Sequence, residues 1–189
     1  MSSMRKIILA TNVTPDGFCD HRAVLADNEL HQFYADLLKD ADTLLFGRKT
    51  FQLLEPYWPT VAKNRTGTKG EIAFADQAER IHKVVFSRSG ITSNWNNTTI
   101  LSVLDEDIIL RMKEQPGKNI LVGSPSIVDQ LAMNGLIDEF CFLIQPIVAG
   151  SGKRFFETAS LPKHLTLNLK ESRLLGSGVI VMWYEKKGP

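Results

Sequence analysis

Short apolar runs of strand length recur along this chain, and in its first two thirds they alternate with helical patterns. Parallel strands that are covered on both faces read as continuous apolar runs, and each parallel connection needs a crossover, which is usually a helix. The alternation therefore predicts an α/β sheet with helices on both faces. The strands are expected at residues 6–12, 43–46, 83–87, 98–102 (a weaker run), 119–122 and 139–148.

The end of the chain follows a different pattern. Apolar runs at residues 165–175 and 179–185 are joined by Gly176-Ser177-Gly178. A tight turn of this kind between two strands predicts an antiparallel hairpin, which we expect at one edge of the sheet.

Helix signals fill the spaces between the runs. Asp27 can cap a helix to about Lys39, whose apolar face would carry Leu30, Phe33, Tyr34, Leu37 and Leu38. Asp105 can cap a second helix to about Gln115. Further helices are expected at residues 49–57, closed by Pro56 and Pro59, at 74–81, and after 123–126 to about 134–135. Residues 12–26 and 61–70 are expected to be loops.

Size and composition narrow the function classes. A chain of 189 residues, 43% of them hydrophobic, is expected to form one domain over residues 1–189. The formal net charge of +1 gives no bulk-charge argument for nucleic acid or a membrane surface as a partner. No stretch reads as a signal peptide or a bilayer span, so a cytoplasmic protein is expected. Cys19 and Cys141 match no metal-ligand spacing, and no metal site is predicted.

The strand at residues 43–46 runs directly into Gly47-Arg48-Lys49-Thr50 at the start of a helical segment. Helix N-termini bind anions, so the two cations and the hydroxyl could hold phosphates. The alternative is an exposed basic first turn in which Thr50 is only a local cap. Because cations are unfavourable at the positive end of a helix dipole, their presence at this turn favours an anionic ligand.

Two further turns follow buried runs. Gly123-Ser124-Pro125-Ser126 comes after residues 119–122, and Ser124 or Ser126 can cap the helix that Pro125 begins. Ser87 and Arg88 end another run and could hold a ribose phosphate. Each could equally be a simple helix start or polar loop. Ligands of open α/β sheets bind beyond the carboxyl ends of strands, so the turns together suggest a phosphorylated cofactor.

Other motifs are weaker or absent. Asp16 and His21, in an acidic loop, are candidates for proton transfer, although a solvated turn explains them too. The segment Gly150–Lys153 lacks the first glycine and the Ser or Thr of a P-loop. No Rossmann fingerprint, metalloprotease helix or nucleophile elbow occurs.

In the order of its motifs, the chain resembles the dihydrofolate reductase-like superfamily. These motifs are the first strand, the Asp-Gly loop, GRKT, SR, GSPS, LIDEFCFLIQPIVAGSGKRFF and the terminal hairpin. The similarity is greatest to the C-terminal reductase domain of the bifunctional riboflavin-biosynthesis deaminase–reductase and its stand-alone relatives. It covers nearly the whole chain. It implies a mixed sheet of about eight strands, mostly parallel, with a C-terminal antiparallel hairpin and helices on both faces.

The resemblance also implies a function, an NADPH-dependent reduction of a pterin- or pyrimidine-type substrate, and a homodimer to which residues 139–148 contribute. By similarity, Gly47, Arg48, Lys49 and Thr50 would hold cofactor phosphates, and Ser87 and Arg88 the adenosine 2′-phosphate end. Residues 123–126 would support the pyrophosphate and nicotinamide, and the loop with Asp16 would cover the nicotinamide. The substrate side would be lined by Asn12, Leu54 and Tyr57.

The chain departs from the family pattern at two places. Relatives that reduce the ribosylamino-uracil intermediate usually carry Glu-Gly-Gly where this chain has Gly123-Ser124-Pro125. Dihydrofolate reductases proper place one acid of the first helix against the pterin, and here Asp27, Glu29 and Asp36 are all available. The missing glutamate leaves room for an alternative, a nucleotide-binding sensor or interaction protein without turnover.

Overall fold

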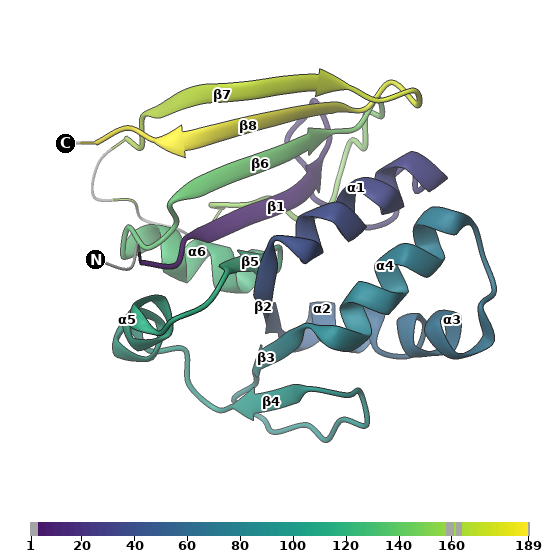
Figure 1. Ribbon diagram of the computed structural model, residues 1–189. Helices are drawn as coiled ribbons and strands as arrows, with labels where there is room; N and C mark the ends of the chain where they lie inside the picture. Colours follow the sequence, from purple (N-terminus) through teal and green to yellow (C-terminus); the bar gives the residue numbers. More distant parts are fainter. Residues whose placement is uncertain (1–3, 158–160, 162–163, 189) are drawn as a thin grey trace.

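The computed structural model describes residues 4–157, 161 and 164–188, and they build one eight-stranded mixed sheet in the order β4-β3-β2-β5-β1-β6-β8-β7 (Figure 1). The first six of these pair in parallel, and β8 pairs antiparallel with both β6 and β7. The strands are β1 Ile7–Val13, β2 Ala41–Gly47, β3 His82–Phe86, β4 Thr98–Leu101, β5 Asn119–Val122, β6 Glu139–Ile144, β7 Leu167–Leu174 and β8 Ile180–Lys186. The predicted sheet and its terminal hairpin are confirmed.

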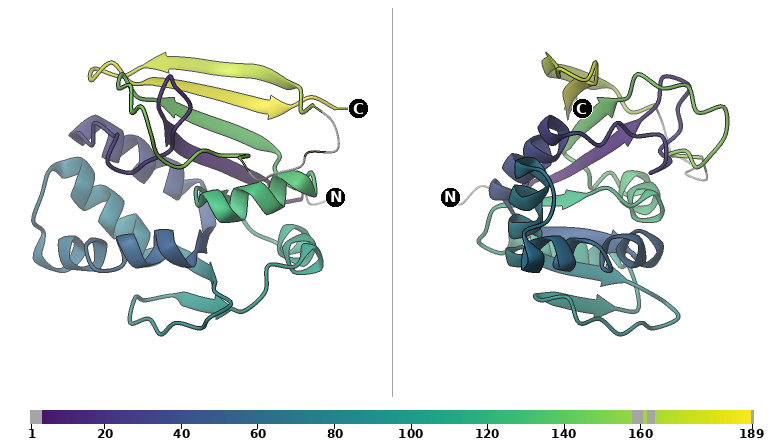
Figure 2. Two further views of the ribbon diagram at one scale, coloured as in Figure 1. Left: turned by 180° about the vertical axis from the view of Figure 1, so that it is seen from behind. Right: turned by 90° about the vertical axis from the view of Figure 1, so that its right-hand side faces the viewer.

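Helices lie on both faces of this sheet, as the alternation predicts. Figure 2 shows α1 and α4 on one side of the strands and α6 on the other. The helices are α1 Asn28–Lys39, α2 Arg48–Leu54, α3 Trp58–Asn64, α4 Lys69–Arg80, α5 Glu106–Glu114 and α6 Pro125–Met133. None of the helices in the described residues is long and apolar enough to cross a membrane.

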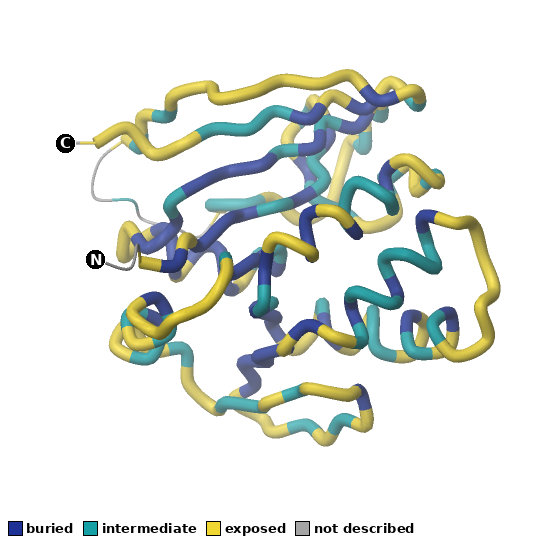
Figure 3. Tube along the Cα trace, viewed as in Figure 1, coloured by how far each residue is buried: buried dark blue, intermediate teal, exposed yellow. Residues whose placement is uncertain are grey.

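The core divides between the two faces because successive strand residues point to opposite sides. Leu45 packs with Ile109 and Ile127, on the side of α5 and α6. Its neighbour Phe46 packs with Ala75 and other residues on the side of α4. The central strands are accordingly the most buried part of the molecule, whereas β7 is exposed along most of its length (Figure 3).

The structure corrects one strand boundary. The apolar run 139–148 was expected to be a single long strand, but β6 ends at Ile144, and Gln145 begins an irregular segment. The buried Gln145 donates from Nε2 to Asn12 Oδ1 and accepts from the Leu25 amide, both at 2.9 Å. Since β6 lies between β1 and β8, both of its edges are already paired.

The segment between α2 and β3 is also more helical than expected. The helix predicted at 49–57 ends at Leu54, and α3 extends into the predicted loop 61–70. Pro59 lies in the first turn of α3, where proline is tolerated, so it starts a helix and does not end one. Helix α4 begins at Lys69, before the expected residue 74, because Thr68 and Glu71 form a capping box.

Helix α4 packs closely on α1 at Gly70. The Gly70 amide donates to Asn28 Oδ1 at 2.8 Å, and a Cβ at Gly70 would overlap the Asn28 carbonyl oxygen and approach the Gln32 amide nitrogen to 3.0 Å. We expect Gly70→Ala to lower the free energy of unfolding by about 1–3 kcal/mol, because the helices must separate. Urea denaturation measures this change. Ala73→Gly, a substitution within the same helix that adds no atom, should cost only about 1 kcal/mol.

Candidate functional site

A cavity of about 620 Å³ opens where the parallel strands end at their carboxyl edge. Its walls include Asn12 at the end of β1, Phe46 near the end of β2, and Gly123 just after β5. In the sheet β5 lies between β2 and β1, although the chain forms β1 and β2 first. A ligand site is expected beyond strand ends at such a change in strand order.

Two of the predicted turns meet at this edge. A Cβ at Gly47 would lie 2.6 Å from Ser126 Oγ and 3.6 Å from Ser124 Cβ, so the start of α2 is in contact with the start of α6. Lys49 and Thr50 from the first turn, and Gly123, Pro125 and Ser126 from the second, all line the cavity. The structure therefore places half of the predicted cofactor residues in the wall of one cavity.

Two hydroxyls beside these turns have no hydrogen-bond partner. Ser87 Oγ and Ser124 Oγ are both sealed from solvent and unpaired in the described structure. Ser124 occupies the N-cap position of α6, but its side chain makes no capping hydrogen bond, contrary to the expected capping role. Ser126 lies within α6, so it is not the cap either. Buried polar groups without partners are rare and call for an explanation, such as a ligand.

The remaining cations lie beside the cavity. Arg48 and Arg88 are exposed, and neither forms an ion pair with any other described residue. They follow the ends of the paired strands β2 and β3, in which Gly47 lies opposite Phe86. Arg48, Ser87 and Arg88 are not among the residues that line the cavity, so this part of the predicted phosphate site lies outside the cavity wall.

The Asp-Gly loop is attached to a distant segment through Asp16. Its carboxylate accepts from Thr14 Oγ1 at 2.5 Å, from the Gly150 amide at 2.7 Å and from the Ala149 amide at 3.2 Å. These bonds, the one from Thr14 first, lower the pKa of Asp16 to about 2. Asp16 does not line the cavity. This geometry favours a structural role for Asp16 over proton transfer.

His21 does line the cavity, at its exposed mouth. Its Nδ1 lies 3.6 Å from Asp20 Oδ1. Hydrogen bonds from Arg22 hold the pKa of Asp20 well below its usual range, so that carboxylate stays ionised beside the imidazole. The neighbouring thiol of Cys19 also lines the cavity, and burial raises its pKa to about 11, which leaves it unreactive at neutral pH.

The opposite side of the cavity is apolar. Here α1, β2, α2 and α4 contribute a surface that we call the inner wall, formed by Tyr34, Leu37, Leu38, Leu44, Leu54 and Phe74. Leu54 was predicted to line the substrate side. Tyr57, predicted with it, lies outside the cavity, where its hydroxyl donates to Glu71 Oε1 at 3.0 Å.

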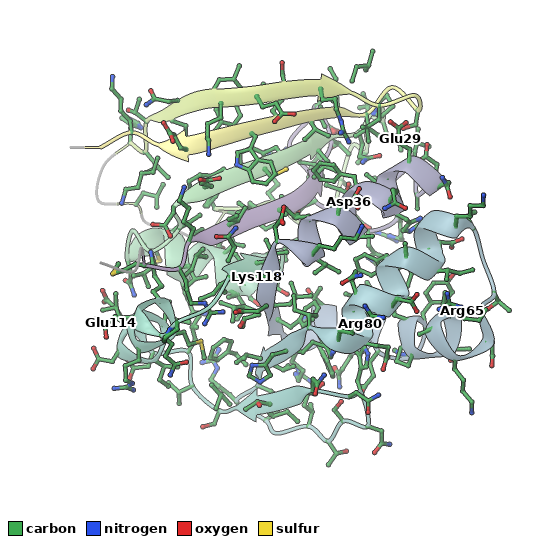
Figure 4. The ribbon with its side chains drawn as sticks, in the orientation of Figure 1. Glu29, Asp36, Arg65, Arg80, Glu114 and Lys118 are labelled. Atoms are coloured by element: carbon green, nitrogen blue, oxygen red, sulfur yellow. The ribbon has the colours of Figure 1, made fainter. Side chains whose placement is uncertain are left out.

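No acid of α1 reaches this cavity. Asp27 caps the helix by accepting from the Leu30 amide, and Glu29 accepts from the Gly176 amide at 2.7 Å. Asp36 pairs with Lys39 (Figure 4 labels Glu29 and Asp36). The three candidate acids thus all have other partners, and α1 contributes Tyr34, Leu37 and Leu38 to the cavity in their place.

Comparison with known proteins identifies the family. A family model described as the RibD C-terminal domain matches residues 5–181. The chain belongs to the RibD C-terminal domain family. The resemblance seen in the sequence is thereby confirmed, and so is the fold class. A curated member, the uncharacterized protein YyaP of Bacillus subtilis (strain 168), is 32% identical over 192 residues, covering 97% of this chain and 96% of the relative.

Solved structures show the same fold. A candidate riboflavin biosynthesis protein from Shewanella sp. PV-4 superposes with a TM-score of 0.73 at 17% identity, covering 97% of this chain and 99% of that one. The diaminohydroxyphosphoribosylaminopyrimidine deaminase/5-amino-6-(5-phosphoribosylamino)uracil reductase of Thermotoga maritima gives a TM-score of 0.67 at 14% identity. That match covers 97% of this chain but 57% of the Thermotoga chain.

Proposed function

We propose that this protein is an NADPH-dependent reductase that transfers hydride to a pterin- or pyrimidine-type substrate. The observation that carries the proposal is the cavity at the carboxyl edge of the sheet, where Lys49, Thr50, Gly123 and Ser126 converge from two helix starts. Membership of the RibD C-terminal domain family supports a reductase-like role. Bound NADPH would supply the hydride, and the protein would supply binding, orientation and exclusion of water.

The residues present fit such a cofactor. The unpaired Ser87 Oγ and Ser124 Oγ can each donate to an anionic oxygen, and the exposed Arg48 and Lys49 can neutralise phosphates. The glycine at position 47 leaves the space between the two turns open, because a side chain there would meet Ser126. Of the groups suited to phosphate, Lys49, Thr50 and Ser126 lie in the cavity wall, and the others lie in the turns next to these residues or at the end of β3.

We propose His21, which lies in the cavity wall, as the carrier of the proton that the reduction needs. Imidazoles act as general acids and bases, and His21 lies at the mouth, next to the ionised Asp20. Asp20 would orient the ring through Nδ1. We therefore keep His21 as the proposed proton-transfer residue, whereas Asp16 would hold the Asp-Gly loop against residues 149–150.

A second candidate function follows from the position of the α1 acids. Because Asp27, Glu29 and Asp36 all lie outside the cavity wall, the site offers no α1 carboxylate to a bound ring. This observation favours, as the alternative, a nucleotide-binding sensor or interaction protein that keeps the cofactor site without turnover.

Cofactor consumption separates the two functions. We expect the protein to bind NADPH, measured by the change in NADPH fluorescence, and to oxidise it when dihydrofolate or 5-amino-6-(5-phosphoribosylamino)uracil is added. Binding of NADPH without oxidation in the presence of either compound would support the alternative. Absence of NADPH binding would remove both functions at once.

The expected cellular setting is a cytoplasmic homodimer. We propose that residues 139–148 contribute to the dimer. Both edges of β6 pair within the sheet, whereas Val148, beyond its end, is 77% exposed. Sedimentation of the purified protein tests the oligomeric state.

A further inference from the structure

Among the six described residues that form the inner wall, Tyr34 is the one whose side chain can form a hydrogen bond. It lines the cavity from the middle of α1 and makes no hydrogen bond with any described residue. It is also not one of the unpaired polar atoms that are sealed from solvent. The hydroxyl is therefore open to the cavity and free to bind a molecule in it.

The position of the Tyr34 ring is set by its aromatic neighbours. Its ring meets that of Phe33 edge-on, with centroids 5.9 Å apart, and that of Phe74 edge-on at 6.4 Å. Phe74 in turn packs on the buried Trp58 at 4.4 Å. A phenol held between two packed rings, one of them itself packed on Trp58, presents its hydroxyl in a fixed direction, which is the preorganisation that a binding site needs.

The protonation state of this phenol suits a donor. Burial raises the pKa of Tyr34 well above its usual range, so the hydroxyl keeps its proton at physiological pH. A phenol that keeps its proton donates one hydrogen bond, and a carbonyl oxygen or ring nitrogen is its natural partner.

The rest of the inner wall selects against charge. Leu37, Leu38 and Leu54 offer no partner to an anion, and a charge placed against them would lose its hydration without compensation. The lysines of the cavity, Lys49 and Lys153, are exposed. Leucines and the ring of Phe74 instead suit a flat apolar group, as in most small-molecule sites.

We infer that Tyr34 binds the hydride acceptor: its hydroxyl donates a hydrogen bond to one acceptor atom of a flat, uncharged ring that lies on the inner wall. That the bound ring is a hydride acceptor rests on the proposed reductase function. That Tyr34 binds a flat, uncharged ring rests on the geometry of the cavity. Tyr34 on α1 thus binds the ring in the way that the three candidate acids cannot, because those acids lie outside the cavity wall.

Binding of two fluorescent rings of similar size tests this inference without turnover. Pterin carries carbonyl and ring-nitrogen acceptors, and naphthalene carries none. Each is titrated against the protein with and without NADP⁺, and against the variants Tyr34→Phe and Tyr184→Phe. The second variant is a matched control, because the Tyr184 hydroxyl lies outside the cavity, 3.7 Å from Met182 Sδ.

We expect Tyr34→Phe to weaken pterin binding about 2- to 12-fold, the range for one neutral hydrogen bond, and to leave naphthalene binding unchanged. Tyr184→Phe should change neither. The inference is overturned if Tyr34→Phe weakens both rings equally, which would indicate packing alone, or leaves both unchanged. It is also overturned if pterin does not bind at up to about 1 mM, a binding free energy near −4.1 kcal/mol.

A separate measurement, of NADPH binding, tests the proposed function. NADPH binding is measured on the same samples, and Tyr34→Phe should leave it unchanged. Failure to bind NADPH would remove the reductase proposal, while pterin binding that depends on Tyr34 would still support a ring-binding site. If the protein binds NADPH but Tyr34→Phe does not change pterin binding, the inference is wrong and the reductase proposal stands.

Discussion

Replacing Glu139 with alanine is expected to lower the free energy of unfolding by about 3 kcal/mol, at the lower end of the range for breaking a buried charge pair. Glu139 begins β6 and is 4% exposed. Its carboxylate accepts from Lys6 Nζ at 2.6 Å, Lys170 Nζ at 2.9 Å and Trp183 Nε1 at 2.5 Å. The lower end applies because the two lysines can turn to water, whereas the indole nitrogen cannot.

Urea denaturation of the alanine variant measures the loss, and the matched control is Glu185→Ala. Glu185 is a glutamate directly opposite Glu139 in the β6–β8 register, but it is exposed. Its removal should change stability by no more than about 0.5 kcal/mol. Equal effects of the two substitutions would mean that strand pairing, and not the buried carboxylate, accounts for the loss.

The same carboxylate predicts a pH dependence. Burial raises the pKa of Glu139, but the hydrogen bonds from Lys6, Lys170 and Trp183 outweigh it and hold the pKa below its usual range. As the pH falls through the usual range of a glutamate, the unfolded chain therefore binds more protons than the folded one. The stabilisation is fully present above that range and is lost as the pH falls through the lowered pKa of the folded protein. Glu139→Gln should flatten this part of the stability profile, which denaturation at several pH values would show.

Glu139 lies at the opposite edge of the sheet from the cavity. At the amino edge of the strands, buried charged groups are paired with more exposed partners: Glu139 pairs with Lys6, and Lys113 pairs with Asp138. At the carboxyl edge the polar groups Ser87 and Ser124 are left unpaired instead. A buried polar group without an internal partner calls for an explanation, and a bound ligand is one. Substitutions at Glu139 should therefore reduce stability without a specific effect on NADPH binding.

The strands could be predicted from the sequence because a buried parallel strand is a continuous apolar run, whatever lies around it. The end of β6 was not predicted, although Gln145-Pro146 interrupts the apolar run, because apolar residues return at 147–148. In the structure, the hydrogen bonds of Gln145 to Asn12 and Leu25 show that the chain leaves the sheet. Helix α3 was missed for a related reason. A proline ends one helix or begins another, and the sequence around Pro59 does not say which.

The candidate site, like the fold, could be predicted from the sequence only in part. Lys49, Thr50, Gly123, Pro125 and Ser126 could be grouped in advance because parallel strands place their carboxyl ends at one edge. Tyr34, Leu37, Leu38 and Phe74 could not be assigned to a site. An apolar stripe on a helix has the same spacing whether it packs on the core or lines a cavity beside it.

Replacing Arg48 with alanine is expected to weaken NADPH binding about 10- to 150-fold, which corresponds to about 1.5–3 kcal/mol for one charge-assisted phosphate contact. NADH binding should change much less, because Arg48 follows the strand end paired with the one that leads to Ser87 and Arg88, the predicted 2′-phosphate residues, and NADH lacks that phosphate. Arg48 is exposed and has no ion-pair partner among the described residues, so no internal carboxylate competes with the cofactor for it. Fluorescence titrations of both cofactors at one ionic strength measure the two losses.

Arg80→Ala is the matched control, since Arg80 ends α4 (Figure 4), just before the start of β3, and does not line the cavity. Arg88→Ala is the companion variant, because Arg48 and Arg88 follow paired strands. A larger loss of NADPH binding at Arg88 than at Arg48 would assign the 2′-phosphate to the end of β3. Equal losses for NADPH and NADH at Arg48 would instead assign it to the pyrophosphate that the two cofactors share. No loss for either cofactor would show that the basic turn after β2 binds no phosphate of the nucleotide.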